Sequence, residues 1–167
     1  MLYIGIDPGL SGAIGYLHVF EDGGEDAQAV DMPVAAYSQG VVKNAVDLPA
    51  LAAELWAAGK GHESGACPAV VFMERVNAMP GQGVSSVFSL GMSYWGVAGV
   101  VAAIGLPLNL IAPATWKAYF KLPADKEFAR GLASRLYPRV NLSKKKHHGR
   151  AEALLIARYA RLTTKGG

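Results

Sequence analysis

The stretch YIGIDPGLSGAIGYLHV, residues 3–19, predicts how the fold begins. Residues 3–6 and 13–19 are apolar runs of strand length, and the Pro-Gly and Ser-Gly pairs between them are typical of turns. The stretch is therefore predicted to form a buried hairpin. Asp7 does not fit this core, because a carboxylate at the end of a buried strand is costly to desolvate unless it has a partner. Asp7 is the first candidate functional residue.

The composition is that of a single globular domain spanning residues 1–167. Hydrophobic residues make up 51% of the chain and charged residues 17%, which excludes an intrinsically disordered protein. The net charge of +3 and the pI near 9.0 favour an acidic partner. Cys67 is the only cysteine, so no intrachain disulfide can form, and the N-terminus shows no secretory signal pattern. We expect a cytoplasmic protein.

The central part of the chain, residues 76–116, contains no Asp, Glu, Lys or Arg. A transmembrane helix at residues 84–104 is therefore one interpretation. Serines and glycines dilute this apolar run, however, and a helix buried inside a protein is also hydrophobic on all sides. We expect a central buried helix and no membrane contact.

The remaining elements follow in an order that predicts an α/β fold, a mixed β-sheet flanked by helices. A third strand near residues 28–32 ends at Pro33, and a helix is expected from the N-cap Asp47 to Gly59. Further strands are expected at residues 69–76 and 108–112, and further helices at residues 84–104, 125–137 and about 150–162. The strand AVVFMERV at residues 69–76 has the apolar pattern of a strand covered on both faces.

Two further acids stand at positions that belong in a core. Glu74 interrupts the apolar run AVVFMERV, and its neighbour Arg75 points to the opposite face of the strand. In HHGRAEALLIARYARL, residues 147–162, Glu152 shares a helix face with Leu155 and Ile156, which should pack on the sheet. A cap or an ion pair would explain any one of these acids alone. Three acids brought together repel one another and favour a bound divalent cation.

Helix geometry indicates a fourth ligand just before Glu152. A residue four positions earlier lies only about 40° away around the helix, whereas a residue five positions earlier lies about 140° away. This favours His148 over His147, and Gly149 has no side chain to offer. A histidine near a helix start is commonly just solvated, so a site of three carboxylates is the alternative.

These motifs resemble the RuvC family of Holliday junction resolvases, which has an RNase H-like fold. The resemblance lies in IGIDPGLSGAIG, in the acid that closes the strand VVFMERV, and in the late helix whose acid is followed by ALLIA. The segments ERVNAMPGQGVSSVFSLGMSYWGVAG, PATWK and GRAEALLIARY are similar to the phage and prophage branch. The resemblance covers residues 1–160, with the elements in the family's order.

The resemblance implies a site for divalent metal ions. Asp7, Glu74 and Glu152 match the family's acids on the first strand, the central strand and the last helix. They would bind two Mg²⁺ ions, one activating a water and one holding the leaving 3′ oxygen, and Mn²⁺ could substitute. Family members place a further acid or histidine three residues before the last acid, where this chain has Gly149. His148, or alternatively His147, would then complete the site.

The resemblance also implies DNA contacts around this site. Family lysines in the turn before the second amphipathic helix approach the scissile phosphate, and the lysine run at residues 144–146 directly precedes the catalytic helix. Such a run is also commonly a solvated loop. Residues 79–80 lie where family members carry an aromatic wedge, and their apolar side chains could open the junction. The candidate DNA-binding residues are Lys117, Lys121, Lys126, Lys144, Lys145, Lys146, Met79 and Pro80.

The predicted function is a structure-specific endonuclease that resolves Holliday junctions and related branched DNA by paired, metal-dependent phosphodiester cleavage. The resemblance implies a homodimer in the cytosol of a bacterial host, and the glycine- and serine-rich helix at residues 84–104 is a candidate dimer surface. A catalytically inert branched-DNA-binding protein of the same fold is the alternative. Actin-like and sugar-kinase ATPases begin with a similar motif, but they need two domains, more than 167 residues supply.

Overall fold

The computed structural model describes residues 1–36, 43–59, 69–78 and 80–164, and its centre is a five-stranded sheet. The strand order is β3-β2-β1-β6-β7, and a separate two-stranded ribbon contains β4 and β5. The strands are β1 (Leu2–Asp7), β2 (Ala13–Val19), β3 (Glu25–Asp31), β4 (Val34–Ala36), β5 (Asn44–Val46), β6 (Ala69–Glu74) and β7 (Leu108–Ile111). The first three strands form an antiparallel meander, and β6 and β7 extend the sheet in parallel with β1.

The direction of the strands places two of the predicted acids at one edge of the sheet. β1 is antiparallel to β2, with Asp7 opposite Ala13, and parallel to β6, with Ile6 opposite Met73. Parallel neighbours end at the same edge, so Asp7 at the end of β1 and Glu74 at the end of β6 lie side by side.

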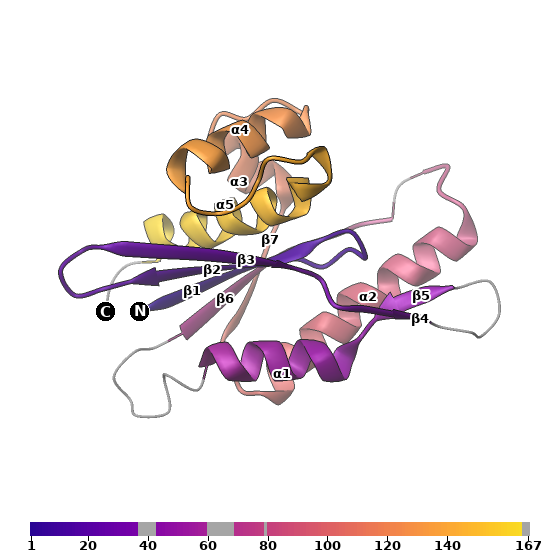
Figure 1. The fold of residues 1–167 in the computed structure, drawn as a ribbon. Helices are drawn as coiled ribbons and strands as arrows, with labels where there is room; N and C mark the ends of the chain where they lie inside the picture. The colour runs from indigo at the N-terminus through magenta and orange to yellow at the C-terminus, as the bar shows by residue number, and fades with distance from the viewer. Residues whose placement is uncertain (37–42, 60–68, 79, 165–167) are drawn as a thin grey trace.

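Helices cover both faces of this sheet, as Figure 1 shows. One face carries α1 (Leu48–Gly59) and α2 (Val84–Ala103), and the other carries α3 (Pro113–Tyr119), α4 (Lys126–Leu136) and α5 (His148–Thr163). Each layer has its own apolar core, the first around Leu51 and Leu55 and the second around Trp116. The mixed sheet flanked by helices that the sequence predicts is confirmed.

Helix α5 lies directly against the backbone of β1 and β2, because both strands carry glycine beneath it. A Cβ atom at Gly5 would stand 2.0 Å from the carbonyl oxygen of Ala153 and 2.5 Å from the nitrogen of Ala157. A Cβ atom at Gly15 would stand 2.6 Å from the nitrogen of Leu154. No side chain fits at these two positions, and the small side chains of α5 complete the close contact.

The structure adds three short elements that the sequence analysis did not predict. These are the β4–β5 ribbon, the seven-residue helix α3, and the 3₁₀ turn η2 (Lys145–His147) that leads into α5. All are too short for a hydrophobic period to be visible. The third strand also begins earlier than predicted, at Glu25, because its polar residues pair with β2 from Val19 onward.

Helix α2 is, among the described helices, the one long and apolar enough to cross a membrane by length and composition. Its inner face packs on α1 and on β5 through Val97 and Val101, which are fully buried. Only 28% of its apolar window is buried inside the chain. The outer face therefore exposes large apolar side chains, including Phe88 and Trp95.

Candidate active site

The three predicted acids form one electrostatic cluster at the edge of the sheet where β1 and β6 end. Asp7 and Glu74 come from these strands, and Glu152 comes from the first turns of α5, where it is only 4% exposed. Burial and, next, the charge of Glu152 raise the pKa of Asp7. Burial, followed by the charges of Asp7 and Glu152, raises the pKa of Glu74 to about 7. The three acids therefore lie close enough to influence one another's ionisation, and their role in a shared metal site stays a prediction.

The turn after β1 holds the Asp7 carboxylate in place. The backbone N–H of Gly9 donates a hydrogen bond of 3.3 Å to Asp7 Oδ1. Gly12 lies so close that a Cβ atom there would stand 2.2 Å from the Asp7 carbonyl oxygen. The DPGLSG motif therefore serves a tight turn packed around Asp7.

Lys117 lies inside the acid cluster, which the sequence analysis did not foresee. Its Nζ stands 3.0 Å from Glu152 Oε1, and its charge also lowers the pKa of Glu74. Trp116, which is fully buried, lies beneath it, with Lys117 Nζ 5.0 Å from the ring centroid. The Trp116 indole N–H lowers the pKa of Glu74 as well, although its geometry falls short of a full hydrogen bond. The PATWK motif thus supplies a counter-charge to the acids.

The cluster fits a divalent cation by its chemistry. Three acids face one lysine, which leaves the cluster negative whenever all of them are ionised, and Glu152 Oε1 accepts no well-formed hydrogen bond. Carboxylate oxygens are the ligands that Mg²⁺ prefers. Within the described part of the chain, no three His, Cys, Asp or Glu side chains stand close enough to share one ion. The side chains of the acids would have to come closer together to share a cation.

The two candidate histidines face different neighbours. His148 is the first residue of α5, its Nδ1 is 3.1 Å from the carbonyl oxygen of Lys145, and its charge lowers the pKa of Asp7. His147 is buried, and its Nδ1 accepts the Lys144 N–H at 3.4 Å. Burial and then the charge of Arg150 lower the pKa of His147. Of the two residues, His148 is the one whose charge acts on Asp7, and its role as a metal ligand stays a prediction.

Gly149 has no room for a side chain. A Cβ atom there would stand 2.6 Å from the carbonyl oxygen of Ser11 and 3.1 Å from the backbone of Gly12. The first turn of α5 packs on the turn that follows Asp7, and this contact brings Glu152 to the cluster. An acid at position 149 is excluded by that packing.

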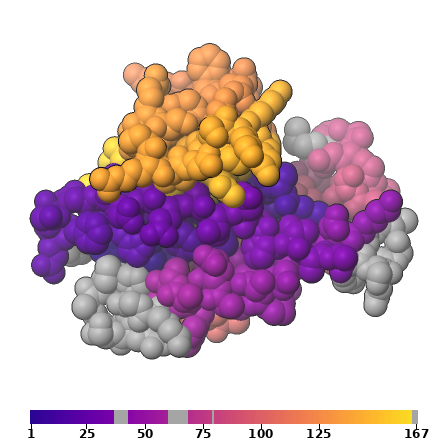
Figure 2. All heavy atoms as spheres, viewed as in Figure 1, coloured from indigo at the N-terminus to yellow at the C-terminus, as the bar shows by residue number. Residues whose placement is uncertain are grey.

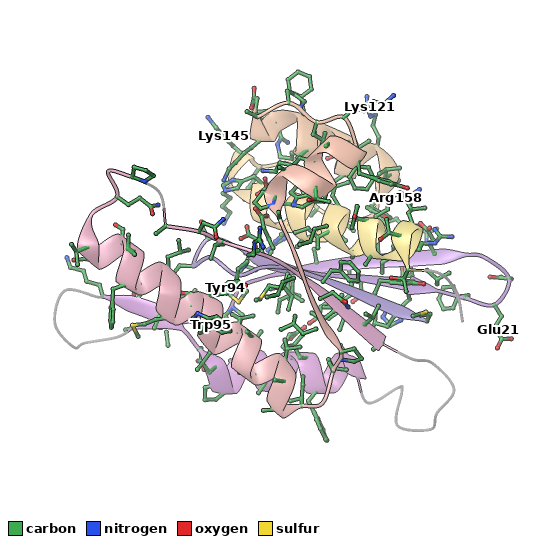
Figure 3. All side chains as sticks on the ribbon, turned by 180° about the vertical axis from the view of Figure 1, so that it is seen from behind. Glu21, Tyr94, Trp95, Lys121, Lys145 and Arg158 are labelled. Carbon is green, nitrogen blue, oxygen red and sulfur yellow. The ribbon has the colours of Figure 1, made fainter. Side chains whose placement is uncertain are left out.

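The candidate DNA-binding lysines lie mostly on the α3–α5 side of the molecule. Lys126 lies near the cluster, since its charge lowers the pKa of Asp7. Lys121 is exposed just beyond α3 with a φ of 54°, and Figure 3 shows it in the same layer as Lys145. The run at residues 144–146 is exposed at the start of η2. Pro80 is exposed before α2, and Met79 lies outside the described residues.

Comparison with known proteins identifies the fold. No family model and no curated protein sequence matches the chain. Among solved structures, RuvC of Thermus thermophilus aligns over 98% of both chains with a TM-score of 0.60 and 21% identity. The same protein in complex with a Holliday junction substrate aligns equally far, with a TM-score of 0.60 and 18% identity. The chain therefore has the RNase H-like fold of these structures, as the sequence predicts.

Proposed function

We propose that this protein is a structure-specific endonuclease that cuts Holliday junctions and related branched DNA. One observation supports the proposal: acids from β1, β6 and α5, of which Glu152 is buried and Asp7 and Glu74 are half-buried, influence one another's pKa at the edge of a sheet whose fold is shared with RuvC. RuvC has been solved in complex with a Holliday junction, which supports branched DNA as the substrate. Within that family, the phage and prophage branch has the most similar motifs.

The acids Asp7, Glu74 and Glu152, completed by His148 with His147 as the alternate, would hold two Mg²⁺ ions. Bound there, the ions supply an activated water and stabilise the leaving oxygen of the phosphodiester. Lys117 Nζ lies 3.0 Å from Glu152 Oε1, and with the carboxylate charge neutralised by bound cations its ammonium group would be available to a phosphate of the DNA. A histidine nitrogen among the ligands would make Mn²⁺ an effective substitute.

DNA would approach across the α3–α5 layer, where the positive charge is gathered. Lys117 lies nearest the acids and Lys126 is close to Asp7, and Lys121 and the run at residues 144–146 extend the basic surface outward. Each lysine that neutralises a phosphate releases a counterion, so binding should weaken steeply with salt. Met79 and Pro80, in the loop between β6 and α2, are proposed to contact the branch point.

A homodimer is proposed to form through the outer face of α2. Phe88 and Trp95 on this face are 60% and 68% exposed, and Trp95 borders a hollow of about 400 Å³ together with Leu110. In Figure 3, Trp95 lies on α2, in the layer opposite Lys121 and Lys145. A second copy would cover this face and supply the second nick that a symmetric junction needs. We also propose a cytoplasmic protein, in which a second copy and not a membrane covers the apolar face of α2.

Replacement of Asp7 tests the enzymatic part of the proposal. Asp7→Asn removes a metal ligand and a negative charge, so nicking of a synthetic four-way junction in Mg²⁺ should fall by about a hundredfold or more. Junction binding in a gel-shift assay should be kept or become tighter, because less charge repels the phosphates. Asp26→Asn, on β3, is the matched control and should nick at the wild-type rate.

The outcome also decides between the enzyme and the inert binder. Wild-type protein that binds the junction but nicks it in neither Mg²⁺ nor Mn²⁺ would establish the inert branched-DNA-binding alternative. Equal nicking by wild type and Asp7→Asn would remove Asp7 from the chemistry.

A further inference from the structure

A second hollow opens beside Asp7, and none of the predicted DNA-binding residues lines it. It has a volume of about 410 Å³ and lies between the β1–β2 turn, the start of β5 and the first half of α2. Gly9 forms part of its wall, and the Gly9 N–H donates to Asp7 Oδ1, so this hollow and the acid cluster share one turn. In Figure 1, β5 and α2 lie side by side here.

The hollow is lined by groups that donate hydrogen bonds. Ser85, Ser89 and Ser93 follow one another at intervals of four, which places them on one face of α2. Lys43 and Asn44 stand opposite, at the start of β5. None of the described residues that line the hollow is acidic. We call this set of five residues the serine groove.

Two further observations point to a ligand in the serine groove. Ser93 is only 4% exposed, yet its hydroxyl makes no hydrogen bond with any other described residue. Its hydroxyl is not among the fully buried unpaired atoms, so it reaches the hollow, where it is free to pair with a ligand. The first turn of α2 has neither a side-chain cap nor an acidic residue, so its free N–H groups add a positive dipole to the same groove.

The chemistry of the groove selects one class of ligand. Without carboxylates it offers nothing to a cation, and its hydroxyls, amide and ammonium group suit an anion with many acceptor oxygens. A phosphodiester backbone carries such oxygens at regular spacing. Lys43 is the one lysine among the described residues of the groove, so a DNA strand bound there would be positioned mainly by neutral hydrogen bonds.

We propose that the serine groove holds the phosphodiester backbone of the DNA strand next to the bond that is cut. This inference rests on the proposed function, because the groove is useful only beside a site that cuts DNA. The serine hydroxyls and the Asn44 amide fix the position of the strand, and Lys43 neutralises one phosphate. The position of the strand along the groove is thereby fixed, so that one particular phosphate lies at the acids.

A charge-removal scan tests the contact of Lys43 with a phosphate. Four-way junctions carry a single uncharged methylphosphonate at successive positions beside the nick made by the wild type. At the contacted position, wild-type binding in a gel-shift assay without divalent ions should weaken about fivefold. Lys43→Gln should show no further loss at that position, and the slope of log affinity against log salt should fall by about 0.9. Arg135→Gln, an equal charge change on the exposed face of α4, is the control. Like the wild type, it should bind about fivefold more weakly when the methylphosphonate stands at the contacted position.

The hydroxyl contacts are tested by the double variant Ser89→Ala with Ser93→Ala. Loss of two neutral hydrogen bonds should raise KM for junction nicking about tenfold without changing the salt slope. Ser134→Ala on α4 is the control and should leave KM unchanged. A lower unfolding temperature of the double variant with an unchanged KM would show a purely structural role and overturn the hydroxyl contacts.

The outcomes separate this inference from the proposed function. Suppose that the wild type binds and nicks the junction, but that Lys43→Gln and the methylphosphonate each weaken binding independently at every position tested. The serine groove then holds no DNA strand. The proposed function then stands without it. If the wild type neither binds nor nicks branched DNA, both proposals are overturned together.

Discussion

Helices α5 and α2 cover opposite faces of the same sheet, and the more polar of the two is the more buried. α5 carries Arg150, Glu152, Arg158 and Arg161, yet its residues from Ala151 onward to Ala157 are all buried. α2 has no charged residue and still exposes Trp95. The difference lies in the sheet, because glycines under α5 admit its backbone, whereas α2 meets ordinary side chains. Burial of a helix is thus set by its partner surface as much as by its own composition.

Disruption of the contact between α5 and β1 should have the largest effect on stability. Gly5→Ala places a Cβ atom 2.0 Å from the Ala153 oxygen, so α5 must move away from the sheet. We expect a loss of about 3 kcal/mol or more in the free energy of unfolding, measured by urea denaturation. On α2, Gly99→Ala meets no atom within 4 Å and should stabilise the protein by about 0.5–1 kcal/mol. Similar small effects of both changes would show that α5 does not depend on this contact.

The exposed face of α2 should matter for association and not for folding. Trp95→Glu places a charge at the centre of the proposed dimer surface, where it would be desolvated without a partner. Self-association measured by sedimentation should weaken about a hundredfold, with the monomer's unfolding curve unchanged. Phe128→Glu on α4, where the aromatic ring is 59% exposed, is the matched control and should associate like the wild type. A wild-type protein that stays monomeric at high concentration would contradict the proposed dimer through α2.

The two faces also differ in how stability should respond to pH. On the α5 side, burial and then the charges of Asp7 and Glu152 raise the pKa of Glu74 to about 7, whereas the apolar layer of α2 adds no charge. The folded state therefore holds this proton more tightly than the unfolded chain, and stability is lost as pH rises through about 7. Without divalent ions, the wild type should lose about 1–2 kcal/mol more than Glu74→Gln between pH 5 and pH 8. The control Glu21→Gln, in the exposed turn before β3, should follow the wild type, and equal curves for wild type and Glu74→Gln would contradict the prediction.

Much of this architecture is visible in the sequence, because strands and helices of ordinary length carry a hydrophobic period. The same patterns single out Asp7, Glu74 and Glu152, since an acid in an apolar run needs a reason. The pairing of Lys117 with Glu152 is different, because it depends on α3, a helix of seven residues that no period reveals. The PATWK motif was a signal for it, as Pro113 opens the helix and Trp116 anchors it.

Gly149 shows how the structure explains a departure that the sequence only records. The chain has Gly149 where members of the family it resembles carry an acid or a histidine, and from sequence alone this leaves a ligand missing. The contact with Ser11 and Gly12 shows that position 149 is a packing position, where a side chain is excluded. His148, one residue earlier and on the Asp7 side, is the position left for a ligand. Sequence cannot show this, because the contact joins segments far apart in the chain.

The seating of α5 on β1 and β2 also sets when the protein can become complete during synthesis. A ribosome adds about 5–20 residues per second, so β1 and β2 exist for several seconds before α5 is made. During that time no helix covers Gly5 and Gly15, and Asp7 has no Glu152 beside it. A nascent chain therefore carries Asp7 before Glu152 exists, so the acid cluster of the proposed active site cannot form until α5 has been made.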